Sequence, residues 1–314
     1  MATVVRSFAI QGIDGYPVDI EIKMLEGQPS ISIIGLGDQA VKEAAERIQA
    51  AIDESGYIFP KKRVIISLAP SDKKKSGSHF DLAMAVGVLC QNGDIGVKKL
   101  PDYGFIGELS LDGRLRACRG ILPMIIAGQK RGIKKIIVPE ANFKEASLVH
   151  GVEILGFYDL IGVVRYLEGK TSGIEMHMEE NEKILEESER ILDFKDVKGQ
   201  DELIEAVVLA AAGGHNMLMV GEPGCGKTMI AQRIPTILPE MTEEECLEVT
   251  KIYSISGLLP NGHTLMKYRP FRAPHHNASL NALIGGGANA MPGEVSLAHN
   301  GVLFLDELAE FSRR

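Results

Sequence analysis

The order of apolar and polar residues along the first half of the chain predicts alternating strands and helices. Residues Val4 to Leu25 have the pattern of two strands around the turn Gly12-Ile13-Asp14-Gly15. Apolar residues recur at helical spacing from Gln39 to Ile52, which predicts a helix. The other predicted elements are strands at Ser30–Ile34, Arg63–Leu68, Tyr103–Leu109 and Lys135–Val138 and helices at Phe80–Cys90 and Leu122–Lys130. This part of the chain is therefore predicted to be mixed α/β.

A charged stretch separates this part from a second predicted α/β unit. Residues 170–193 contain seven glutamates and one aspartate among few apolar residues, which indicates a solvated linker. The second unit begins with a helix at Asp201–Ala212, a strand at Asn216–Val220 and a helix from Lys227 onward. We therefore predict one domain at residues 1–169, the acidic linker at 170–193 and a second domain at 194–314.

The composition fits a folded protein and narrows its functions. The 314 residues are 45% apolar and 24% charged, enough for two domains of about 150 residues each. The sequence has no apolar run of about 18 residues and no signal-peptide pattern, so we expect a cytoplasmic location and no membrane association. The four cysteines form no Cys-x-x-Cys pair, so we expect neither disulfides nor zinc. A net charge of −8 argues against a nucleic-acid coat but allows a local basic patch.

One segment of eight residues has the pattern of a phosphate-binding P-loop. It matches G-x-x-x-x-G-K-[ST] and consists of Gly221, Glu222, Pro223, Gly224, Cys225, Gly226, Lys227 and Thr228. The strand predicted before it and the helix predicted after it are the context that this loop requires. Glycines let backbone N–H groups and the helix N-terminus face phosphate oxygens, Lys227 would reach the β and γ phosphates, and Thr228 would offer a hydroxyl to Mg²⁺. We therefore predict that these residues bind ATP.

A pair of carboxylates completes the predicted site. Asp306 and Glu307 follow the apolar run Val302–Leu305, so we expect them at the carboxyl end of a strand, beside the nucleotide. Asp306 would hold Mg²⁺ together with Thr228, and Glu307 would be the general base that orients the attacking water. An apolar run ending in Asp-Glu is a weak signal alone, but Lys227 lies 79 residues before Asp306 and strengthens it. The predicted catalytic residues are Glu307 and Lys227.

Three further segments lie between the P-loop and the acidic pair. They are residues 269–279 (RPFRAPHHNAS), 283–287 (LIGGG) and 292–301 (PGEVSLAHNG). Together with the Asp-Glu strand, they resemble the magnesium-chelatase-like AAA+ family and most closely its YifB/ComM branch. The resemblance runs along the whole chain, and residues 292–301 are its most specific part.

The resemblance implies a ring-forming ATPase that uses ATP and Mg²⁺ and assembles as a hexamer when full length. It implies that the glycine-rich residues 285–291 belong to an insert that faces the central pore. It also implies that residues 197–200 lie against the adenine, with a plain strand-to-helix entry as an equal alternative. For function, the YifB/ComM branch implies a motor that remodels single-stranded or branched DNA, by branch migration or helicase-type action. The alternatives are the motor subunit of a magnesium chelatase and a nucleotide-binding fragment without motor activity.

The first half of the chain carries a second resemblance. Residues 103–114 (YGFIGELSLDGR), 119–122 and 136–142 resemble the proteolytic domain of Lon proteases. We therefore expect a Lon-protease-like N-terminal fold, followed by an incomplete P-loop AAA+ domain. Lon proteases use a serine that a lysine activates, but here these two positions fall on His79 and Leu122. Ser78 would point its hydroxyl elsewhere and has no predicted base, so we expect a scaffold or an interaction surface without peptidase activity.

Two pairs of residues between the main motifs have alternative interpretations. His275 and His276 are adjacent, so on an extended segment they point to opposite faces, and we do not predict a metal site there. Arg269 and Arg272 would contact phosphate or a neighbouring subunit, or would form local ion pairs, and we favour the ion pairs.

The position of Asp306 near the end of the sequence affects the expected activity. The chain ends at Arg314, eight residues after Asp306. The resemblance implies that a polar sensor, an arginine finger and a helical lid follow this point in complete family members. Because arginine fingers accelerate phosphoryl transfer by about 10³- to 10⁵-fold, we expect this chain to bind ATP and hydrolyse little of it.

Overall fold

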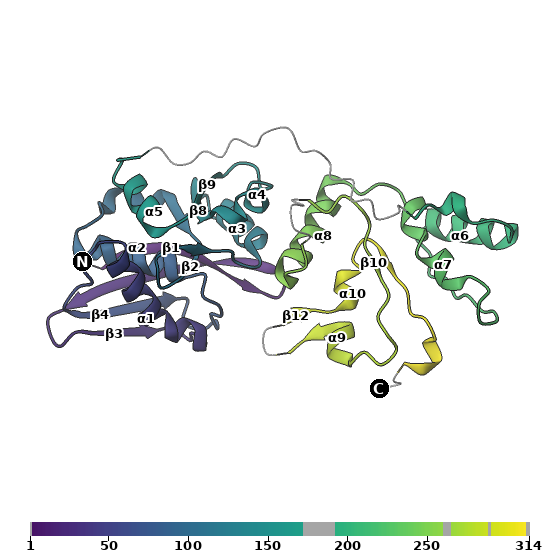
Figure 1. The fold of residues 1–314 in the computed structure, drawn as a ribbon, viewed down its shortest axis with the longest axis horizontal. Helices are drawn as coiled ribbons and strands as arrows, with labels where there is room; N and C mark the ends of the chain where they lie inside the picture. The colour runs from purple at the N-terminus through teal and green to yellow at the C-terminus, as the bar shows by residue number, and fades with distance from the viewer. Residues whose placement is uncertain (1, 172–191, 260–264, 288–289, 312–314) are drawn as a thin grey trace. The chain divides into compact units, whose positions relative to one another are not determined.

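A computed structural model of the chain describes residues 2–171, 192–259, 265–287 and 290–311 (Figure 1). Its contacts divide the chain into two compact units, Met1–Met178 with Ser254–Leu258 and Glu179–Tyr253 with Leu259–Arg314. Most of the predicted acidic linker at 170–193 lies outside the described residues. Within the described ranges, no helix is both long enough and apolar enough to cross a membrane.

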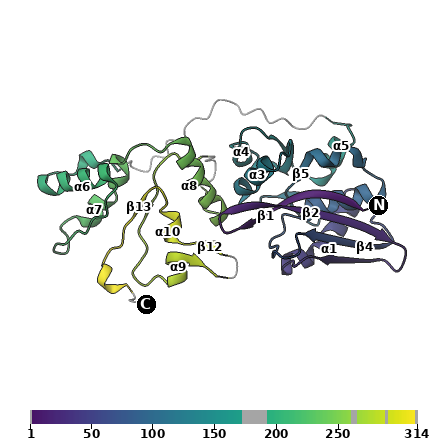
Figure 2. The same cartoon turned by 180° about the vertical axis from the view of Figure 1, so that it is seen from behind.

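The first unit is built on a seven-stranded mixed sheet with the order β3-β4-β2-β1-β5-β8-β9. The long β1–β2 hairpin runs through the middle of this sheet (Figure 2). The β1–β2 and β2–β4 pairs are antiparallel and the remaining pairs are parallel. The strands are β1 (Thr3–Gln11), β2 (Asp14–Leu25), β3 (Ser30–Ile34), β4 (Arg63–Ala69), β5 (Tyr103–Phe105), β8 (Lys135–Pro139) and β9 (Glu153–Phe157).

Helices cover both faces of this sheet. Successive residues of a strand face opposite sides, so Val5 of β1 packs against Gly87 of α2, while Phe8 packs against Gly128 of α3 on the other side. Helices α1 and α5 share the core cluster of α2. The helices are α1 (Gln39–Glu54), α2 (Asp81–Asn92), α3 (Ile121–Lys130), α4 (Phe143–Ala146) and α5 (Leu160–Leu167). The hairpin and the predicted strands and helices of this unit are thus confirmed, with one exception.

The exception is the single strand predicted at Tyr103–Leu109, which is wrong because the chain leaves the sheet after Phe105. The N–H of Gly107 donates to the carbonyl of His79 at 2.8 Å, and its carbonyl accepts from the N–H of Leu82 at 3.0 Å. Gly107 is therefore bonded to the start of α2 instead of a neighbouring strand. The chain then forms a separate small hairpin of β6 (Glu108–Leu109) and β7 (Leu115–Arg116).

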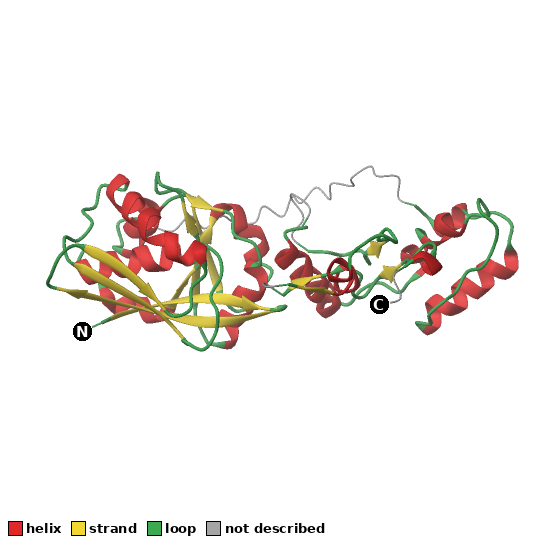
Figure 3. Ribbon diagram, turned by 90° about the horizontal axis from the view of Figure 1, so that it is seen from below, coloured by secondary structure: helices red, strands yellow, loops and turns green. Residues whose placement is uncertain are grey.

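The second unit contains helices and very short strands (Figure 3). Strands β10 and β13 pair in parallel, and β11 and β12 form a small antiparallel hairpin between α9 and α10, in the glycine-rich stretch. Its elements are α6 (Asp201–Gly213), α7 (Lys227–Ala231), α8 (Glu243–Ser256, of which the last three residues belong to the first unit), β10 (Phe271–Arg272), α9 (Leu280–Ile284), β11 (Gly285–Gly286), β12 (Met291–Pro292), α10 (Glu294–Leu297) and β13 (Val302–Leu303).

Two strands predicted for this unit differ from the structure. The segment Asn216–Val220 forms no strand, since none of the described residues pairs with it. Its apolar side chains remain largely uncovered, with Leu218 exposed by 75% and Val220 by 88%. The strand expected at Val302–Leu305 is limited to the two residues that face β10. Both differences have one cause, because an apolar run becomes a strand only where another strand satisfies its backbone groups.

Candidate nucleotide-binding site

The P-loop, residues 221–228, lies in the second unit and leads into α7. Gly224 and Gly226 have φ angles of 80° and 90°, in the left-handed region that favours glycine. A side chain at Gly221 would lie 2.9 Å from the sulfur of Cys225. Glycines at these positions therefore allow the tight curve of the loop.

Lys227 is the first residue of α7, and its side chain folds back over the loop. Its Nζ donates to the carbonyl oxygens of Gly221 at 2.8 Å and Glu222 at 2.9 Å, and lies 3.6 Å from the sulfur of Cys225. These two hydrogen bonds hold the ammonium against the loop. Phosphate oxygens that entered the loop would replace neutral acceptors with charged ones, which form the stronger hydrogen bonds.

Thr228 and Asp306 are brought together although 78 positions separate them. The hydroxyl of Thr228 donates to Oδ2 of Asp306 at 3.0 Å. The other carboxylate oxygen of Asp306, Oδ1, accepts from the backbone N–H of Glu307 at 3.0 Å. A hydroxyl and a carboxylate side by side are oxygen donors of the kind that Mg²⁺ prefers, with phosphate and water as its other ligands. This donor set fits a Mg²⁺–nucleotide complex.

The acidic pair follows strand β13, which pairs with β10. Several contacts hold the segment around β10 in place. The rings of Phe271 and Phe304 stack with their centroids 6.2 Å apart. Arg272 forms a bidentate ion pair with Glu294, with N–O distances of 2.6 and 2.7 Å. Arg269 donates to the carbonyl of Asn300 at 2.7 Å and forms further bonds to residues 239, 240 and 245. The local ion pairs that we favoured for both arginines are present.

Glu307 differs from its neighbours because solvent surrounds most of its side chain, which is 64% exposed. Its backbone is left-handed, with a φ of 52°. Nδ1 of His276 lies 3.1 Å from its Oε2. The described residues contain no group of three or more His, Cys, Asp or Glu that could hold a metal ion. From the sequence, His275 and His276 were considered only as metal ligands. The contact of His276 with Glu307 was not predicted.

Residues 197–200, which the resemblance placed against the adenine, are close to the P-loop. The side-chain amide of Gln200 lies 3.5 Å from the carbonyl oxygen of Cys225. Val197 is buried in a small core with Phe194, Val207 and Ile230. This segment therefore packs as an entry to α6 and also touches the loop.

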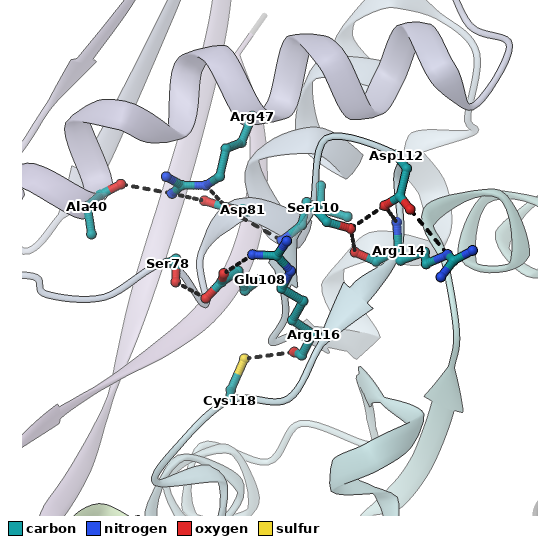
Figure 4. Close-up of polar contacts among 11 residues, drawn as sticks. Ala40, Arg47, Ser78, Asp81, Glu108, Ser110, Asp112, Arg114, Arg116 and Cys118 are labelled. Carbon is teal, nitrogen blue, oxygen red and sulfur yellow. Dashed lines mark hydrogen bonds and ion pairs between the residues drawn. The ribbon is translucent and has the colours of Figure 1, made fainter.

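In the first unit, Ser78 belongs to a polar cluster near the start of α2 (Figure 4). Ser78 donates to a carboxylate oxygen of Glu108, whose other oxygen lies 3.4 Å from Arg116. Arg47 forms a bidentate pair with Asp81, at 2.8 and 3.1 Å. The Ser78 hydroxyl thus faces a carboxylate that is also paired with Arg116.

The two positions that replace the Lon dyad are part of the core. Leu122 is fully buried. His79 is buried as well, and its Nε2–H donates to the carbonyl of Phe8 at 2.9 Å. Burial lowers the pKa of His79 to about 4. Burial also raises the pKa of Asp81 to about 6, although Arg47 opposes this shift. These two residues therefore affect the stability of the unit in opposite directions as the pH changes.

For His79 we expect a loss of stability as the pH falls. The unfolded state binds a proton below the ordinary pKa of about 6.5, while folded His79 stays neutral down to about pH 4. Its contribution is complete above pH 6.5 and falls by roughly 2–3 kcal/mol between pH 7.5 and 4.5. The contribution of Asp81 has the opposite sign and is lost as the pH rises through about 6, so only a comparison of variants isolates His79.

The measurement is hydrogen exchange of the β1 amides in the whole chain at several pH values. The variant His79→Gln keeps a donor for the carbonyl of Phe8 and should lose about 2–3 kcal/mol less opening free energy than the wild type on going from pH 7.5 to 4.5. The exposed His150 supplies the control, because His150→Gln should follow the wild type. Parallel pH profiles for His79→Gln and the wild type would contradict the assignment.

Comparisons with known proteins match both units. The family described as "Magnesium chelatase, subunit ChlI" matches residues 193–314, and "Subunit ChlI of Mg-chelatase" matches residues 20–142. The uncharacterized protein YifB of Escherichia coli K12 is 42% identical over 317 residues, which cover 99% of this chain and 60% of that protein. The competence protein ComM of Haemophilus influenzae is 40% identical over 312 residues, covering 99% and 61%. The chain spans about 60% of the length of these relatives.

The similarity to Lon proteases is more distant and covers a smaller part of the chain. The Lon protease of Rhizobium meliloti is 26% identical over 149 residues, which cover 45% of this chain and 18% of that protein. It supports a Lon-like domain, in agreement with the mixed α/β fold of the first unit. On these findings, the chain belongs to the YifB/ComM-type magnesium-chelatase-like family.

Proposed function

We propose that the chain binds ATP and Mg²⁺ through residues 221–228 and the pair Asp306-Glu307. The contact that carries this proposal is the 3.0 Å hydrogen bond between Thr228 and Asp306, which joins the P-loop to the acidic strand. Membership of a magnesium-chelatase-like family supports nucleotide binding in general terms. Glu222 and Pro223 belong to the proposed phosphate-binding loop, whose backbone N–H groups would face the phosphate oxygens.

Each polar side chain has a distinct task in the proposed site. The ammonium of Lys227 moves from the loop carbonyls to the β and γ phosphates and stabilises their charge. Thr228 and Asp306 hold Mg²⁺, which neutralises phosphate charge when it is bound. Glu307, with its exposed carboxylate, orients the attacking water and accepts its proton as a general base. In this proposal the reaction is ATP hydrolysis, with Glu307 and Lys227 as the catalytic residues.

For the complete gene product we propose a cytoplasmic, hexameric ring that uses this ATPase site to remodel single-stranded or branched DNA. Two observations support this proposal. The chain is similar over 99% of its length to a protein that is named for competence. The hairpin β11–β12 lies between α9 and α10 and is part of a glycine-rich stretch. Such a stretch suits a loop that would contact a DNA strand in the pore of the ring.

A second candidate is the motor subunit of a magnesium chelatase. Both matched family descriptions name a chelatase subunit, which favours this function. The similarity of the first unit to Lon proteases argues against it, because it relates this part of the chain to a protein that is not a chelatase. The third candidate is a binding module without motor activity. Such a protein would bind ATP, and neither DNA nor a chelatase partner would increase its ATP turnover.

The test is the ATP turnover of the complete gene product, measured alone, with single-stranded DNA and with a branched DNA junction. We expect DNA to increase the turnover several-fold, and we expect Lys227→Ala to remove it, which excludes a contaminating ATPase. Turnover that DNA leaves unchanged and that a chelatase partner with a tetrapyrrole increases would reverse the order of the first two candidates.

A further inference from the structure

Strand β3 forms one edge of the seven-stranded sheet, and among the described strands only β4 pairs with it (Figure 1). The strand at the other edge, β9, is better protected, since its Leu155 and Phe157 are 2% and 3% exposed. By contrast, every residue of β3 is at least partly exposed, and Ile34 is 54% exposed. The backbone groups on the outer side of such an edge can pair with a further strand.

The pairing of β3 with β4 identifies the backbone groups that remain unpaired. The N–H of Ser30 donates to the carbonyl of Lys62 at 3.4 Å, so Ser30 and every second residue after it face β4. The residues between them, Ile31 and Ile33, direct their N–H and carbonyl groups away from β4. These two isoleucines therefore present two donors and two acceptors at the open edge.

The sequence of β3 does not protect this edge. Ser30–Ile34 reads Ser-Ile-Ser-Ile-Ile, without a charge or a proline, whereas soluble proteins usually block an open edge with lysine, proline or a bulge. Lys62, beside the start of the strand, is paired with Glu26 at 2.8 Å. A neutral strand can pair with a copy of itself, because no like charges come to face each other.

The residues at the two ends of β3 allow one register for such a pair. Two copies related by a two-fold axis run antiparallel, and Ile31 opposite Ile33 of the second copy brings all the outward groups of both residues into hydrogen bonds. A shift in one direction places Ile33 opposite Pro29, which has no N–H. A shift in the other direction places Ile31 opposite Gly35, whose φ of 115° is not that of a strand. In the remaining register, Ser32 faces Ser32 of the second copy on the axis.

The same register covers apolar side chains that one chain leaves exposed. A groove of about 550 Å³ lies beside the edge, and its lining includes Pro29, Ile31 and Ile58. Ile58 is 76% exposed there. In the pair, Ile33 of the second copy lies opposite Ile31, and the chain that follows brings its Leu36, 58% exposed, past Pro29. By symmetry the groove of the second copy receives the same residues, so the edge is complementary to itself.

We propose that β3 is an interaction surface for a second copy of this chain, which adds its own β3 in antiparallel orientation with Ser32 of both copies on the two-fold axis. The contact joins the two sheets into one continuous sheet. In the proposed ring, neighbouring copies are related by a rotation that brings two different surfaces together. The β3 contact uses the same surface twice, so it joins copies that are not ring neighbours. It goes beyond the proposed function and does not depend on ATP.

The first experiment tests the register with a cysteine on the axis. The two Ser32 residues form a non-hydrogen-bonded pair, with Cα atoms about 4.5 Å apart, which is within the range of a disulfide. Under a mild oxidant, Ser32→Cys in the 314-residue chain should therefore form a disulfide-linked dimer. The matched control is Ser30→Cys, on the same face of the same strand, because its two copies would be about 13 Å apart along the strand. Both variants also carry Cys225→Ser, which removes the exposed native thiol.

We expect Ser32→Cys to cross-link at least about tenfold faster than Ser30→Cys, because only the first pair meets the geometry of a disulfide. Equal rates for the two variants, or no cross-linking of either, would overturn the proposal.

The second experiment measures the mass of the 314-residue chain by sedimentation equilibrium over a range of concentrations, without ATP. The wild type should approach the mass of a dimer as its concentration rises. Ser32→Lys places two like charges opposite each other on the axis and should weaken the association at least about tenfold. Ser67→Lys is the matched control, since Ser67 lies opposite Ile34 on the same face but belongs to β4, one strand away from the edge. It should associate like the wild type.

Each outcome decides for or against the second copy. A chain that stays monomeric at every concentration would overturn the proposal and leave β3 open to a peptide of another protein. A dimer that Ser32→Lys does not weaken would also overturn it, because the two copies would then meet at another surface. Circular dichroism shows whether Ser32→Lys is folded, and if it is not, the comparison of Ser32→Cys with Ser30→Cys decides. Both experiments omit nucleotide, so a failure of ATP binding would leave their result unchanged.

Discussion

Replacing Lys227 with alanine is expected to weaken ATP binding at least about 100-fold. The ammonium would form charged hydrogen bonds to two phosphates, each worth roughly 1.5–3 kcal/mol. In the structure its partners are neutral carbonyl oxygens of the loop, at 2.8 and 2.9 Å. The variant loses these contacts as well, but they connect residues of an exposed loop, so the effect on folding should be small. Isothermal titration calorimetry of the 314-residue chain with ATP and Mg²⁺ measures the change.

The control for this prediction is another lysine of the same unit. Lys195 is exposed and pairs with Asp193 at 2.8 Å, away from the P-loop sequence. Lys195→Ala removes the same charge from the chain, so it corrects for any general effect of net charge on a polyanionic ligand. We expect its affinity for ATP to be within twofold of the wild type. Undiminished ATP affinity in Lys227→Ala would refute the assignment of the P-loop.

The fold of the first unit could be predicted because its signals are local. The turn after β1, the helical spacing in α1 and the apolar run of β4 each depend on neighbours in the sequence. The strand expected at Tyr103–Leu109 failed for a non-local reason, since Gly107 bonds to His79 and Leu82 of another segment. The apolar pattern of the seven residues Tyr103–Leu109 contains no information about these hydrogen bonds. Strand β9 and helix α5, which the sequence analysis did not identify, follow the last predicted strand.

In the second unit, too, strands could not be predicted where they depend on a distant partner. Asn216–Val220 has the apolar pattern of a strand, but pairing is decided by segments elsewhere, and no described segment supplies a partner. The P-loop residues were easier to identify from the sequence, because the motif is defined within eight consecutive residues. The contact of His276 with Glu307 could not be predicted, because it joins two segments that are distant in the sequence. A sequence identifies the groups that can do the chemistry, and the pairing of distant strands determines which of them meet.

Replacing Glu307 with glutamine is expected to separate binding from hydrolysis. The amide has the shape of the carboxylate but is not a base, so the complete gene product should lose about 10²- to 10⁴-fold in kcat. ATP affinity should stay within a few-fold of the wild type, because Lys227, Thr228 and Asp306 are unchanged. Asp306→Asn supplies the contrast, since it should weaken the binding of ATP with Mg²⁺ and not of ATP alone.

The reason for measuring both variants is that each alone has two explanations. A loss of turnover in Glu307→Gln could come from a missing base or from a site that no longer binds Mg²⁺ and nucleotide. Retained affinity in Glu307→Gln, together with a Mg²⁺-dependent loss of affinity in Asp306→Asn, assigns the base to one carboxylate and the metal to its neighbour. Turnover of Glu307→Gln at the rate of the wild type would show that the water is activated without Glu307. The role of Glu307 as the base would then have to be abandoned, while the ATP-binding role of Lys227 would stand.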